Sequence, residues 1–413
     1  LFVCWRVGHE PPREAIEGWR PSPSVARGRS RRPSPRRLLA RAAPRAPWEA
    51  AEGRGPIPSA AGTASLKALS SENKSGALRR LLGRRAASVA KESAGCPGFN
   101  RKASEGWVHV AYTSNENQWE GVKASLASLV ASSKQPAKLI VHILIQRKKV
   151  AAFRREFNFS PKCNSAVTKS GALVRVHPLM GAFMEKIMVV TPNYSKAKNI
   201  DRVILEKTFS TVENYARFFM DLIIGNATVV YLDADTIVQK DVRNIWQELR
   251  ESNRTVGFVQ RHLLPASLEN IVRFPSSCHV QPRRGLNDLK KMPNYNVGVF
   301  AVNLRRWAER RYTDRTLELA KVHRECHLWE NSGSQALLLV TMFNHAEDEP
   351  EDWIAFDPEW NLDGLSYRAF KAEQLEAAAI LHWSGHRKPW QRRARYARFW
   401  TPHRRAYDSL LKG

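Results

Sequence analysis

A short segment near the middle of the chain constrains its fold and chemistry more than any other. Residues 229–232 form the apolar run Val-Val-Tyr-Leu, and Asp233 and Asp235 follow directly. The run is typical of a buried strand, and alternate residues of an extended segment point the same way, so both carboxylates can reach one cation. Buried carboxylates are costly without a partner, and a divalent metal that binds a phosphate is a natural partner. We therefore predict a metal site where this strand leaves the core.

Apolar strands alternate with helices from residue 107 onward. We expect strands at 108–112, 139–145, 172–177, 229–232, 297–303 and 378–382, and helices at 120–130, 149–157, 211–224, 317–324 and 334–343. The strands lack polar alternation, which favours a mainly parallel sheet with helices on both faces. The predicted fold class is α/β, in which ligand sites lie at the carboxyl ends of the strands.

The first 104 residues differ in composition from the rest. They are rich in Arg, Pro, Ala, Ser and Gly, and they cannot bury enough surface to offset their chain entropy. We predict a disordered basic stem or linker over residues 1–104 and one folded domain over residues 105–413. The net charge is +27, and residues 1–100 hold 19 Lys and Arg against 7 Asp and Glu. A nucleic-acid arm is the alternative, but the arginines are not interleaved with aromatic residues that stack bases.

Cysteines and sequons bear on the compartment. Five cysteines lack a paired short spacing, so we expect no cysteine zinc site; one or two disulfides of unreadable connectivity fit, with a thiol left over. Five N-x-S/T sequons mildly favour a secretory route, at Asn73, Asn158, Asn193, Asn226 and Asn253. We interpret the apolar residues 1–5 as a short stretch at the edge of a fragment. No other segment of the sequence approaches the ~18 consecutive apolar residues of a membrane span. We expect membrane contact only through an anchor that precedes Leu1.

Three more segments offer ligand groups. His382 ends the last strand and suits Mn²⁺. In the turn after it, Gly385 lets backbone approach a phosphate, and Lys388 supplies a point charge. Asn296 opens another strand beside a glycine, and Arg217 lies on the helix before the Asp strand, where it can bind phosphate or sugar. Each segment alone reads as an ordinary surface turn, strand or solvated helix. Coupled to the Asp pair, they favour a ligand site.

Together these segments resemble glycosyltransferase family 8, and most of all its galacturonosyltransferase-like members from plants and algae. The resemblance covers roughly residues 107–408. Five motifs carry it: Asn-Tyr-Ala-Arg at 214–217, Tyr-Leu-Asp-Ala-Asp at 231–235, Tyr-Asn-Val-Gly-Val at 295–299, Trp-Asn-Leu-Asp-Gly-Leu at 360–365 and His-Trp-Ser-Gly-His-Arg-Lys-Pro-Trp at 382–390. The last motif is the most specific.

The resemblance implies a GT-A-type nucleotide-sugar-binding fold, a UDP-sugar donor and a glycan or other hydroxyl acceptor. It also implies a catalytic domain at 105–413, transfer of a hexosyl or uronosyl group with retention, a Golgi location in lumen or membrane and a role in cell-wall polysaccharide. By similarity, Mn²⁺ would be held by Asp233, Asp235 and His382. The donor would be bound by Tyr112, Thr113, Asn115 and Asn117 on the uridine, by Arg217 and Asn296 on the sugar, and by Gly385 and Lys388 on the diphosphate. Gly298 would present bare backbone to the donor.

The chain departs from the family pattern at two places. Asn115 stands where the family commonly has an Asp, and Gln118 where it has an aromatic, so the uracil contacts are less defined. Many members place Asp-Gln on the sugar side, where this chain has Ser334 and Gln335. We expect Gln335 to act in catalysis beside the two aspartates, and the donor sugar stays open.

The chemistry agrees with this interpretation. UDP leaves with about two negative charges, which a dication and Lys388 would neutralise; a unit charge pair at ~4 Å and an effective dielectric of ~20 contributes up to ~4 kcal/mol. The expected mechanism is same-face attack, with the departing phosphate oxygen taking the acceptor proton. The alternatives are a haloacid-dehalogenase-like phosphatase, a basic binding protein for RNA or acidic polysaccharide, and an inactive enzyme that kept the fold. Several strands precede the Asp pair, which disfavours the phosphatase.

Overall fold

The structure is a computed structural model that describes Cys96 and residues 106–179, 181–190, 211–259, 261, 267–329, 333–344 and 351–411. The predicted disordered stem lies outside these residues, apart from Cys96. No helix in the described part of the chain is both long and apolar enough to cross a lipid bilayer.

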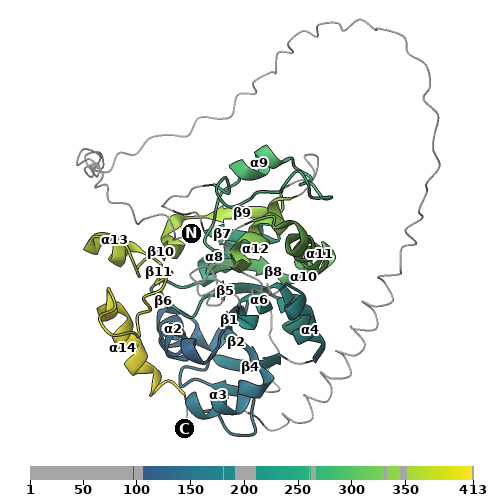
Figure 1. The fold of residues 1–413 in the computed structure, drawn as a ribbon. Coiled ribbons are helices and arrows are strands. Elements are labelled where there is room, and N and C mark those ends of the chain that lie inside the picture. Colours follow the sequence, from purple (N-terminus) through teal and green to yellow (C-terminus); the bar gives the residue numbers. More distant parts are fainter. Residues whose placement is uncertain are drawn as a thin grey trace, which may run out of the picture. The chain divides into compact units, whose positions relative to one another are not determined.

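An eight-stranded sheet forms the centre of the fold (Figure 1). Its strand order is β3-β4-β2-β1-β5-β8-β7-β9. The strands are β1 (Val108–Thr113), β2 (Leu139–Gln146), β3 (Ser165–Val167), β4 (Leu173–Leu179), β5 (Thr228–Leu232), β7 (Val256–Val259), β8 (Val299–Asn303) and β9 (Trp353–Phe356). Each strand predicted from the apolar runs in this sheet is present.

Strand directions make this sheet mixed rather than mainly parallel. The pairs β2–β4, β1–β2, β1–β5 and β7–β9 are parallel. The pairs β3–β4, β5–β8 and β7–β8 are antiparallel. Because β8 runs against β5, its first residues meet the carboxyl end of β5: Val299 is opposite Leu232. The parallel strands β1 and β5 end at the edge of the sheet where the site is predicted, and β8 begins at the same edge.

Helices cover both faces of this sheet, and each face has its own apolar core. One face packs on α4 (Gly181–Val190), α6 (Val212–Ala216), α7 (Met220–Ile223), α10 (Leu304–Glu309), α11 (Tyr312–Cys326) and α12 (Gly333–Phe343). The other face packs on α2 (Trp119–Ser132), α3 (Val150–Glu156) and α8 (Arg243–Ser252). Along β1 the buried Val110 and Tyr112 belong to the second core and Ala111 to the first, so each strand residue is buried on its own side. The α/β class is confirmed.

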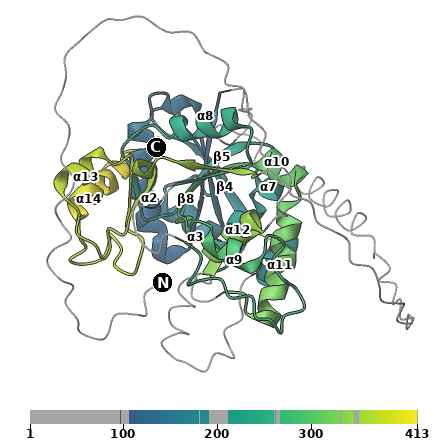
Figure 2. The same cartoon turned by 90° about the horizontal axis from the view of Figure 1, so that it is seen from above.

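A second, three-stranded sheet brings the end of the chain back to the middle. Its order is β10 (Leu362–Asp363), β11 (Ile380–His382) and β6 (Thr236–Val238). A small apolar cluster joins it to α14 (Ala397–Tyr407) and to α13 (Ala372–Ala377). In Figure 2, α13 and α14 lie on one side of the central sheet and α10, α11 and α12 on the other. Among the described residues, the remaining α-helix is α9 (Leu286–Lys291).

The helix predicted at 211–224 is interrupted. It consists of α6, a 3-10 turn at Arg217–Phe219 and α7. Arg217 turns inward at this point, and its Nε donates to the carbonyl oxygen of Asn214 at 2.9 Å. The guanidinium thus bonds to a carbonyl oxygen of the helix backbone. The helix tightens into a 3-10 turn at this point, where the sequence pattern predicts an unbroken α-helix.

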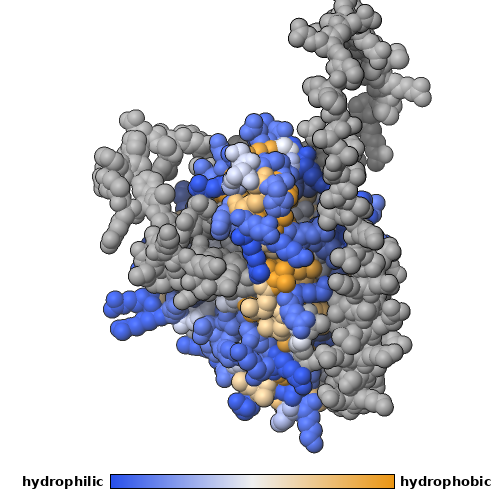
Figure 3. Space-filling view, turned by 45° about the vertical axis from the view of Figure 1, so that its right-hand side comes forward, coloured by the Kyte–Doolittle hydropathy of each residue, from blue (hydrophilic) through white to orange (hydrophobic). Residues whose placement is uncertain are grey.

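Two disulfides link the described cysteines: Cys96 with Cys163 and Cys278 with Cys326. Cys4 lies outside the described residues. On the face seen in Figure 3, hydrophilic residues cover most of the described surface, with a narrow strip of apolar residues between them. Among the described residues, Met188 of α4 is the one large apolar side chain that is exposed.

Candidate active site

Strand pairing brings the end of the chain to the Asp pair. Asp233 follows β5 directly, and Asp235 leads into β6. Strand β11 pairs antiparallel with β6 so that His382 is opposite Thr236, and the amide of Trp383 donates to the carbonyl oxygen of Asp235 at 3.0 Å. This register places His382 beside both aspartates, although about 150 residues separate them in the sequence.

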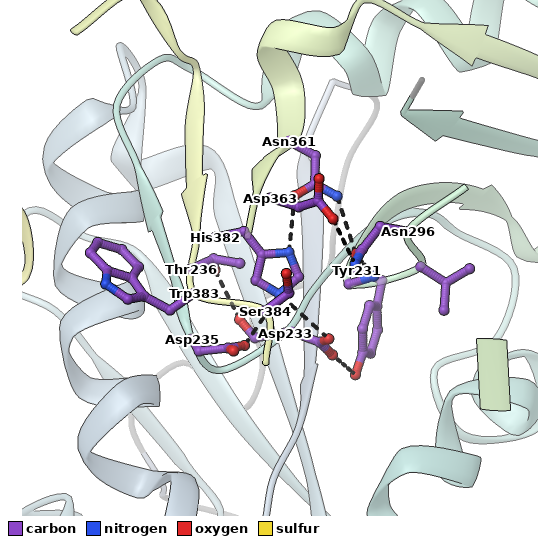
Figure 4. Close-up of polar contacts among 12 residues, drawn as sticks. Tyr231, Asp233, Asp235, Thr236, Asn296, Asn361, Asp363, His382, Trp383 and Ser384 are labelled. Carbon is purple, nitrogen blue, oxygen red and sulfur yellow. Dashed lines mark hydrogen bonds and ion pairs between the residues drawn. The ribbon is translucent and has the colours of Figure 1, made fainter. Parts of the chain in front are cut away.

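The three predicted metal ligands form one cluster (Figure 4). One ligand atom from each of Asp233, Asp235 and His382 lies within 4.8 Å of the other two. His382 Nε2 is 3.5 Å from Asp235 Oδ1 and 4.0 Å from Asp233 Oδ2. The Asp233 side chain is 29% exposed and those of Asp235 and His382 are buried, so the cluster opens to solvent on the Asp233 side.

The His382 ring is fixed from behind. Its Nδ1 lies 3.0 Å from Oδ1 of Asn361, and an amide oxygen can only accept, so Nδ1 carries a proton. Nε2 therefore faces the carboxylates, as Figure 4 shows. Burial alone would lower the pKa of His382, but the charges of Asp235 and Asp233 outweigh burial and raise it.

Lys388 reaches the same cluster from the loop after β11. Its Nζ donates to Oδ2 of Asp235 at 2.5 Å and to the carbonyl oxygen of Trp383 at 3.3 Å. Burial would raise the pKa of Asp235, but Lys388 and His382 together hold it well below its usual range. Asp235 is therefore an ionised, buried carboxylate at neutral pH.

Asp233 is held by two side chains on its other oxygen. Arg217 Nη2 donates to Asp233 Oδ1 at 3.2 Å, and the Tyr231 hydroxyl donates to the same oxygen at 3.0 Å. Arg217 also donates to the carbonyl oxygen of Val297 at 2.8 Å, stacks 4.4 Å from the Tyr231 ring centre and is only 3% exposed in its side chain. This geometry favours a role in positioning Asp233 over the predicted contact with sugar.

The start of β8 provides space rather than side chains. A Cβ at Gly298 would overlap His382 Cε1 and lie 2.6 Å from Asp233 Oδ2. Asn296 beside it accepts from the Gly298 amide at 2.9 Å and donates to Asp363 Oδ2 at 3.4 Å. Gly298 is thus required by the packing of the cluster, and the Asn296 amide is engaged with protein partners.

The predicted uridine residues are divided between core and surface. Tyr112 and Thr113 lie within β1 and not in the loop after it; the Tyr112 ring is buried, with its hydroxyl 3.0 Å from Ser125 Oγ. Both residues are buried, backbone included, so neither is exposed at the site edge. Asn115 caps a 3-10 turn through Asn117 N, and both residues have solvent contact. They stay candidates for uridine binding.

Two other predicted residues have defined surroundings. Gly385 has φ +107, and an added Cβ would lie 3.0 Å from the Tyr367 ring, so both strain and space require glycine. Gln335, at the start of α12, donates from Nε2 to Oδ1 of the buried Asn294 at 2.9 Å. That bond fixes the orientation of the Gln335 amide.

Three site residues have no role in the sequence interpretation. Asn361 supports His382, Asp363 pairs with His382 in the register of β10 and β11, and Arg261 Nη2 donates to Asp363 Oδ2 at 2.8 Å. The signal for the first two was present in the Trp-Asn-Leu-Asp-Gly-Leu motif at 360–365. Arg261 has no local pattern, because its role depends on contact with Asp363, which lies 102 residues later in the sequence.

The family is now defined by comparison. A family model described as Glycosyl transferase family 8 matches residues 109–394, more than half of the chain. The chain therefore belongs to glycosyl transferase family 8, and it is a glycosyltransferase. The resemblance seen in the motifs is confirmed, and the phosphatase and basic-binding-protein alternatives are set aside.

Individual relatives are distant. The chain is 23% identical over 305 residues to "Probable galacturonosyltransferase-like 10" of Arabidopsis thaliana, covering 69% of this chain and 71% of the relative. It is 26% identical over 206 residues to "Glycosyltransferase 8 domain-containing protein 1" of Danio rerio, covering 45% of this chain and 54% of the relative. It spans 42% of "Probable galacturonosyltransferase 5" of Arabidopsis thaliana at 23% identity and 67% coverage of this chain. The chain thus spans about half the length of the last two.

Solved structures are also similar. The galactosyltransferase LgtC in complex with donor and acceptor sugar analogs aligns with a TM-score of 0.49 and 16% identity, covering 74% of this chain and 97% of LgtC. Mouse xyloside xylosyltransferase 1 aligns with a TM-score of 0.39 and 16% identity, covering 67% of this chain and 97% of that structure.

Proposed function

We propose that the chain transfers a hexosyl or uronosyl group from a UDP-sugar to a hydroxyl group of a glycan or other acceptor, with retention at the anomeric carbon. Family 8 membership supports the reaction class. The observation that carries the rest is the convergence of Asp233, Asp235 and His382 within 4.8 Å. The donor nucleotide, the metal and the stereochemistry are parts of this proposal.

The residues fit a divalent metal. Two carboxylates and an imidazole suit Mn²⁺ and similar ions. His382 presents Nε2 because Asn361 occupies Nδ1, and the missing side chain at Gly298 leaves the cluster uncrowded. When bound to Asp233, Asp235 and His382, Mn²⁺ would supply positive charge against the departing diphosphate.

Lys388 is the second positive group. Its ammonium has three protons, and Asp235 and the Trp383 carbonyl oxygen take two, which leaves one donor for a phosphate oxygen. Its side chain is 24% exposed, so a ligand can reach it. Gly385, three residues earlier, provides a backbone that a phosphate can approach closely. Together they would hold and neutralise the leaving UDP.

The acceptor attacks from the face that UDP leaves. The bond between the anomeric carbon and the β-phosphate oxygen breaks, the acceptor oxygen bonds to that carbon, and the acceptor proton passes to the departing phosphate oxygen. Gln335 is expected to line this face, with its amide oriented by Asn294. Asp233 is held in place by Arg217 and Tyr231, which both donate to its Oδ1.

The location and organisation belong to the same proposal. Residues 105–413 form the catalytic domain and residues 1–104 a stem, in the Golgi lumen or at its membrane. Two disulfides among the described cysteines support an oxidising compartment.

The decisive experiment is UDP release with Mn²⁺ across a panel of UDP-glucose, UDP-galactose, UDP-xylose, UDP-glucuronate and UDP-galacturonate. We expect one donor to release UDP faster than the others, and Asp235→Asn to abolish the release while the protein stays folded. Failure of every uridine nucleotide to bind in the presence of Mn²⁺ would overturn the proposal.

A further inference from the structure

Two glycosylation sequons lie at the edge of the central sheet opposite the candidate active site. The sequon at Asn226 ends at Thr228, where β5 begins, and the sequon at Asn253 ends at Thr255, just before β7. β7 runs in the same direction as β5, because both are antiparallel to β8 between them. Both asparagines therefore precede the amino ends of their strands, whereas Asp233 follows the carboxyl end of β5.

Both asparagines have room for a large substituent. Each is exposed to solvent. β5 has five residues, which at about 3.3 Å each separate its two ends by roughly 17 Å. The two strands are two ladder positions apart, or about 10 Å. Oligosaccharides on Asn226 and Asn253 would therefore share one edge of the sheet and leave the opposite edge open to donor and acceptor.

The folded geometry at Asn253 indicates when the modification occurs. Asn253 ends α8 in the left-handed region, and its Oδ1 accepts from Arg306 Nη1 at 2.7 Å. The amide nitrogen Nδ2, which N-glycosylation uses, is not the atom that Arg306 holds. Thr255 is completely buried, and its hydroxyl donates to Asp352 Oδ2 at 2.6 Å. Because folding hides the sequon hydroxyl, Asn253 must be modified before β7 joins the sheet.

Asn226 lies in a less constrained turn. Gly225 before it has φ +89, and Thr228 at the start of β5 is only partly buried. The carbonyl oxygen of Ala227 accepts from Leu304 N at 2.9 Å, which fixes the backbone of the turn while the Asn226 side chain faces solvent. The sequon hydroxyl is thus more accessible here than at Asn253.

The disulfides are independent evidence for a compartment in which N-glycosylation takes place. All four cysteines of the described part of the chain are paired, as Cys96–Cys163 and Cys278–Cys326. Disulfides form in the lumen of the endoplasmic reticulum, where N-linked oligosaccharides are also added. Neither observation uses the candidate active site.

We propose that Asn226 and Asn253 carry N-linked oligosaccharides, which cover the amino edge of the sheet. At each site Nδ2 bonds to the anomeric carbon of an oligosaccharide supplied on a lipid diphosphate. The bond from that carbon to the diphosphate oxygen breaks, the lipid diphosphate leaves, and the amide loses one proton. The described sequon at Asn158 follows α3 and is not part of the proposal.

The test is glycopeptide mapping of the full chain, directed into the secretory pathway of a eukaryotic host by a cleavable signal peptide. The secreted protein is treated with peptide N-glycosidase in ¹⁸O-water, and mass spectrometry reads which asparagines have become labelled aspartate. We expect labelling at both Asn226 and Asn253. An unmodified asparagine at either position in secreted protein that melts cooperatively would overturn the proposal.

Matched variants separate this result from the proposed function. Asn226→Gln and Asn253→Gln should each remove one glycan from the intact mass, and the double variant should retain the Mn²⁺-dependent UDP release of the parent. The mapping requires no transferase activity, so a protein without activity that carries both glycans would refute the proposed function alone. Chain that has folded before exposure to the oligosaccharide transferase should stay unmodified at Asn253; modification there would contradict the burial of Thr255.

Discussion

The Nδ1 atom of His382 lies 3.0 Å from Oδ1 of Asn361, and both side chains are buried. The Asn361 amide donates in turn from Nδ2 to Asn296 Oδ1 at 3.3 Å, and Asn296 donates to Asp363, which Arg261 holds. A series of hydrogen-bonded side chains therefore connects Arg261 to the imidazole of His382. It fixes both the ring orientation of His382 and the nitrogen that faces the aspartates.

This support should control metal affinity. Residues that hold a metal-ligating His typically change affinity or activity 10–100-fold when lost. We expect Asn361→Leu to weaken Mn²⁺ binding by about that factor, because Nδ1 loses its acceptor. Asn361→Asp keeps the acceptor and should bind Mn²⁺ far more tightly than the Leu variant. The measurement is the free Mn²⁺ signal in electron paramagnetic resonance; equal affinity of Asn361→Leu and the parent would show that Asn361 does not position His382.

Arg217 should matter for stability as well as for the site. Its guanidinium satisfies the carbonyl oxygens of Asn214 and Val297 and the carboxylate of Asp233 in a buried position. Its removal leaves buried carbonyl oxygens without a donor, which costs about 1–3 kcal/mol, whereas the Asp233 carboxylate, 29% exposed, keeps contact with solvent. We expect Arg217→Met to lower the free energy of unfolding by an amount in this range, measured by urea denaturation.

The matched control is Arg305→Met. The Arg305 side chain is 67% exposed and pairs with Glu309 at 3.7 Å. An exposed substitution of this kind changes stability by no more than about 0.5 kcal/mol. A similar loss in the two variants would contradict the assigned role of Arg217.

The sequence predicts which residues could bind a metal better than it predicts the contacts that bring them together. Asp233, Asp235 and His382 stand out because an apolar run ends in charge and because a specific motif follows the last strand. Their contact depends on the pairing of Thr236 with His382, in strands of three residues each. Such short strands have no periodic signal, so their pairing cannot be read from local patterns.

The direction of a strand could not be predicted from the sequence for a similar reason. The run at 297–302 has no polar side chain and fits a parallel or an antiparallel strand equally well, so the reversed direction of β8 was not predictable. The break in the 211–224 helix depends on Arg217, which as a helical arginine would ordinarily be solvated. It turns inward only because Asp233 and Val297 lie within reach in the fold.

Metal and nucleotide should stabilise the protein together. A ligand present at 100 times its Kd raises the free energy of unfolding by about 2.7 kcal/mol. We expect UDP with Mn²⁺ to raise Tm, EDTA to remove the increase, and uridine without phosphates to give a smaller one. Asp235→Asn should lose the effect of Mn²⁺, because one of three ligands changes. A full UDP effect in EDTA would contradict the metal assignment; differential scanning fluorimetry reads all four conditions.

Acid should destabilise the protein through three histidines that cross the sheet. His109 Nδ1 is 2.9 Å from His142 Nε2, and His142 Nδ1 is 2.9 Å from His177 Nε2. Burial, with a contribution from Arg175, lowers the pKa of His109 and of His177 to about 4. Burial and the neighbouring His177 and His109 hold the pKa of His142 well below its usual range. With pKa values this low, the three imidazoles are neutral in the folded state at pH 7. They lie on β1, β2 and β4, in the parallel half of the sheet.

The sign follows from proton binding. Below pH 6.5 the unfolded chain protonates these imidazoles, while the folded chain does not until pH is near 4, so stability is greatest above pH 6.5 and falls as pH drops from 6.5 to 4. A pKa difference from 6.5 to about 4 corresponds to on the order of 3 kcal/mol for His109 and for His177. We expect His142→Gln, which can still donate and accept, to lose less stability over this interval than the parent. His279→Gln, at a side chain 63% exposed, should leave the acid limb unchanged. The urea midpoint measured from pH 7 to pH 4 distinguishes the variants, and a parent midpoint that stays constant over that range would refute this account of the three histidines.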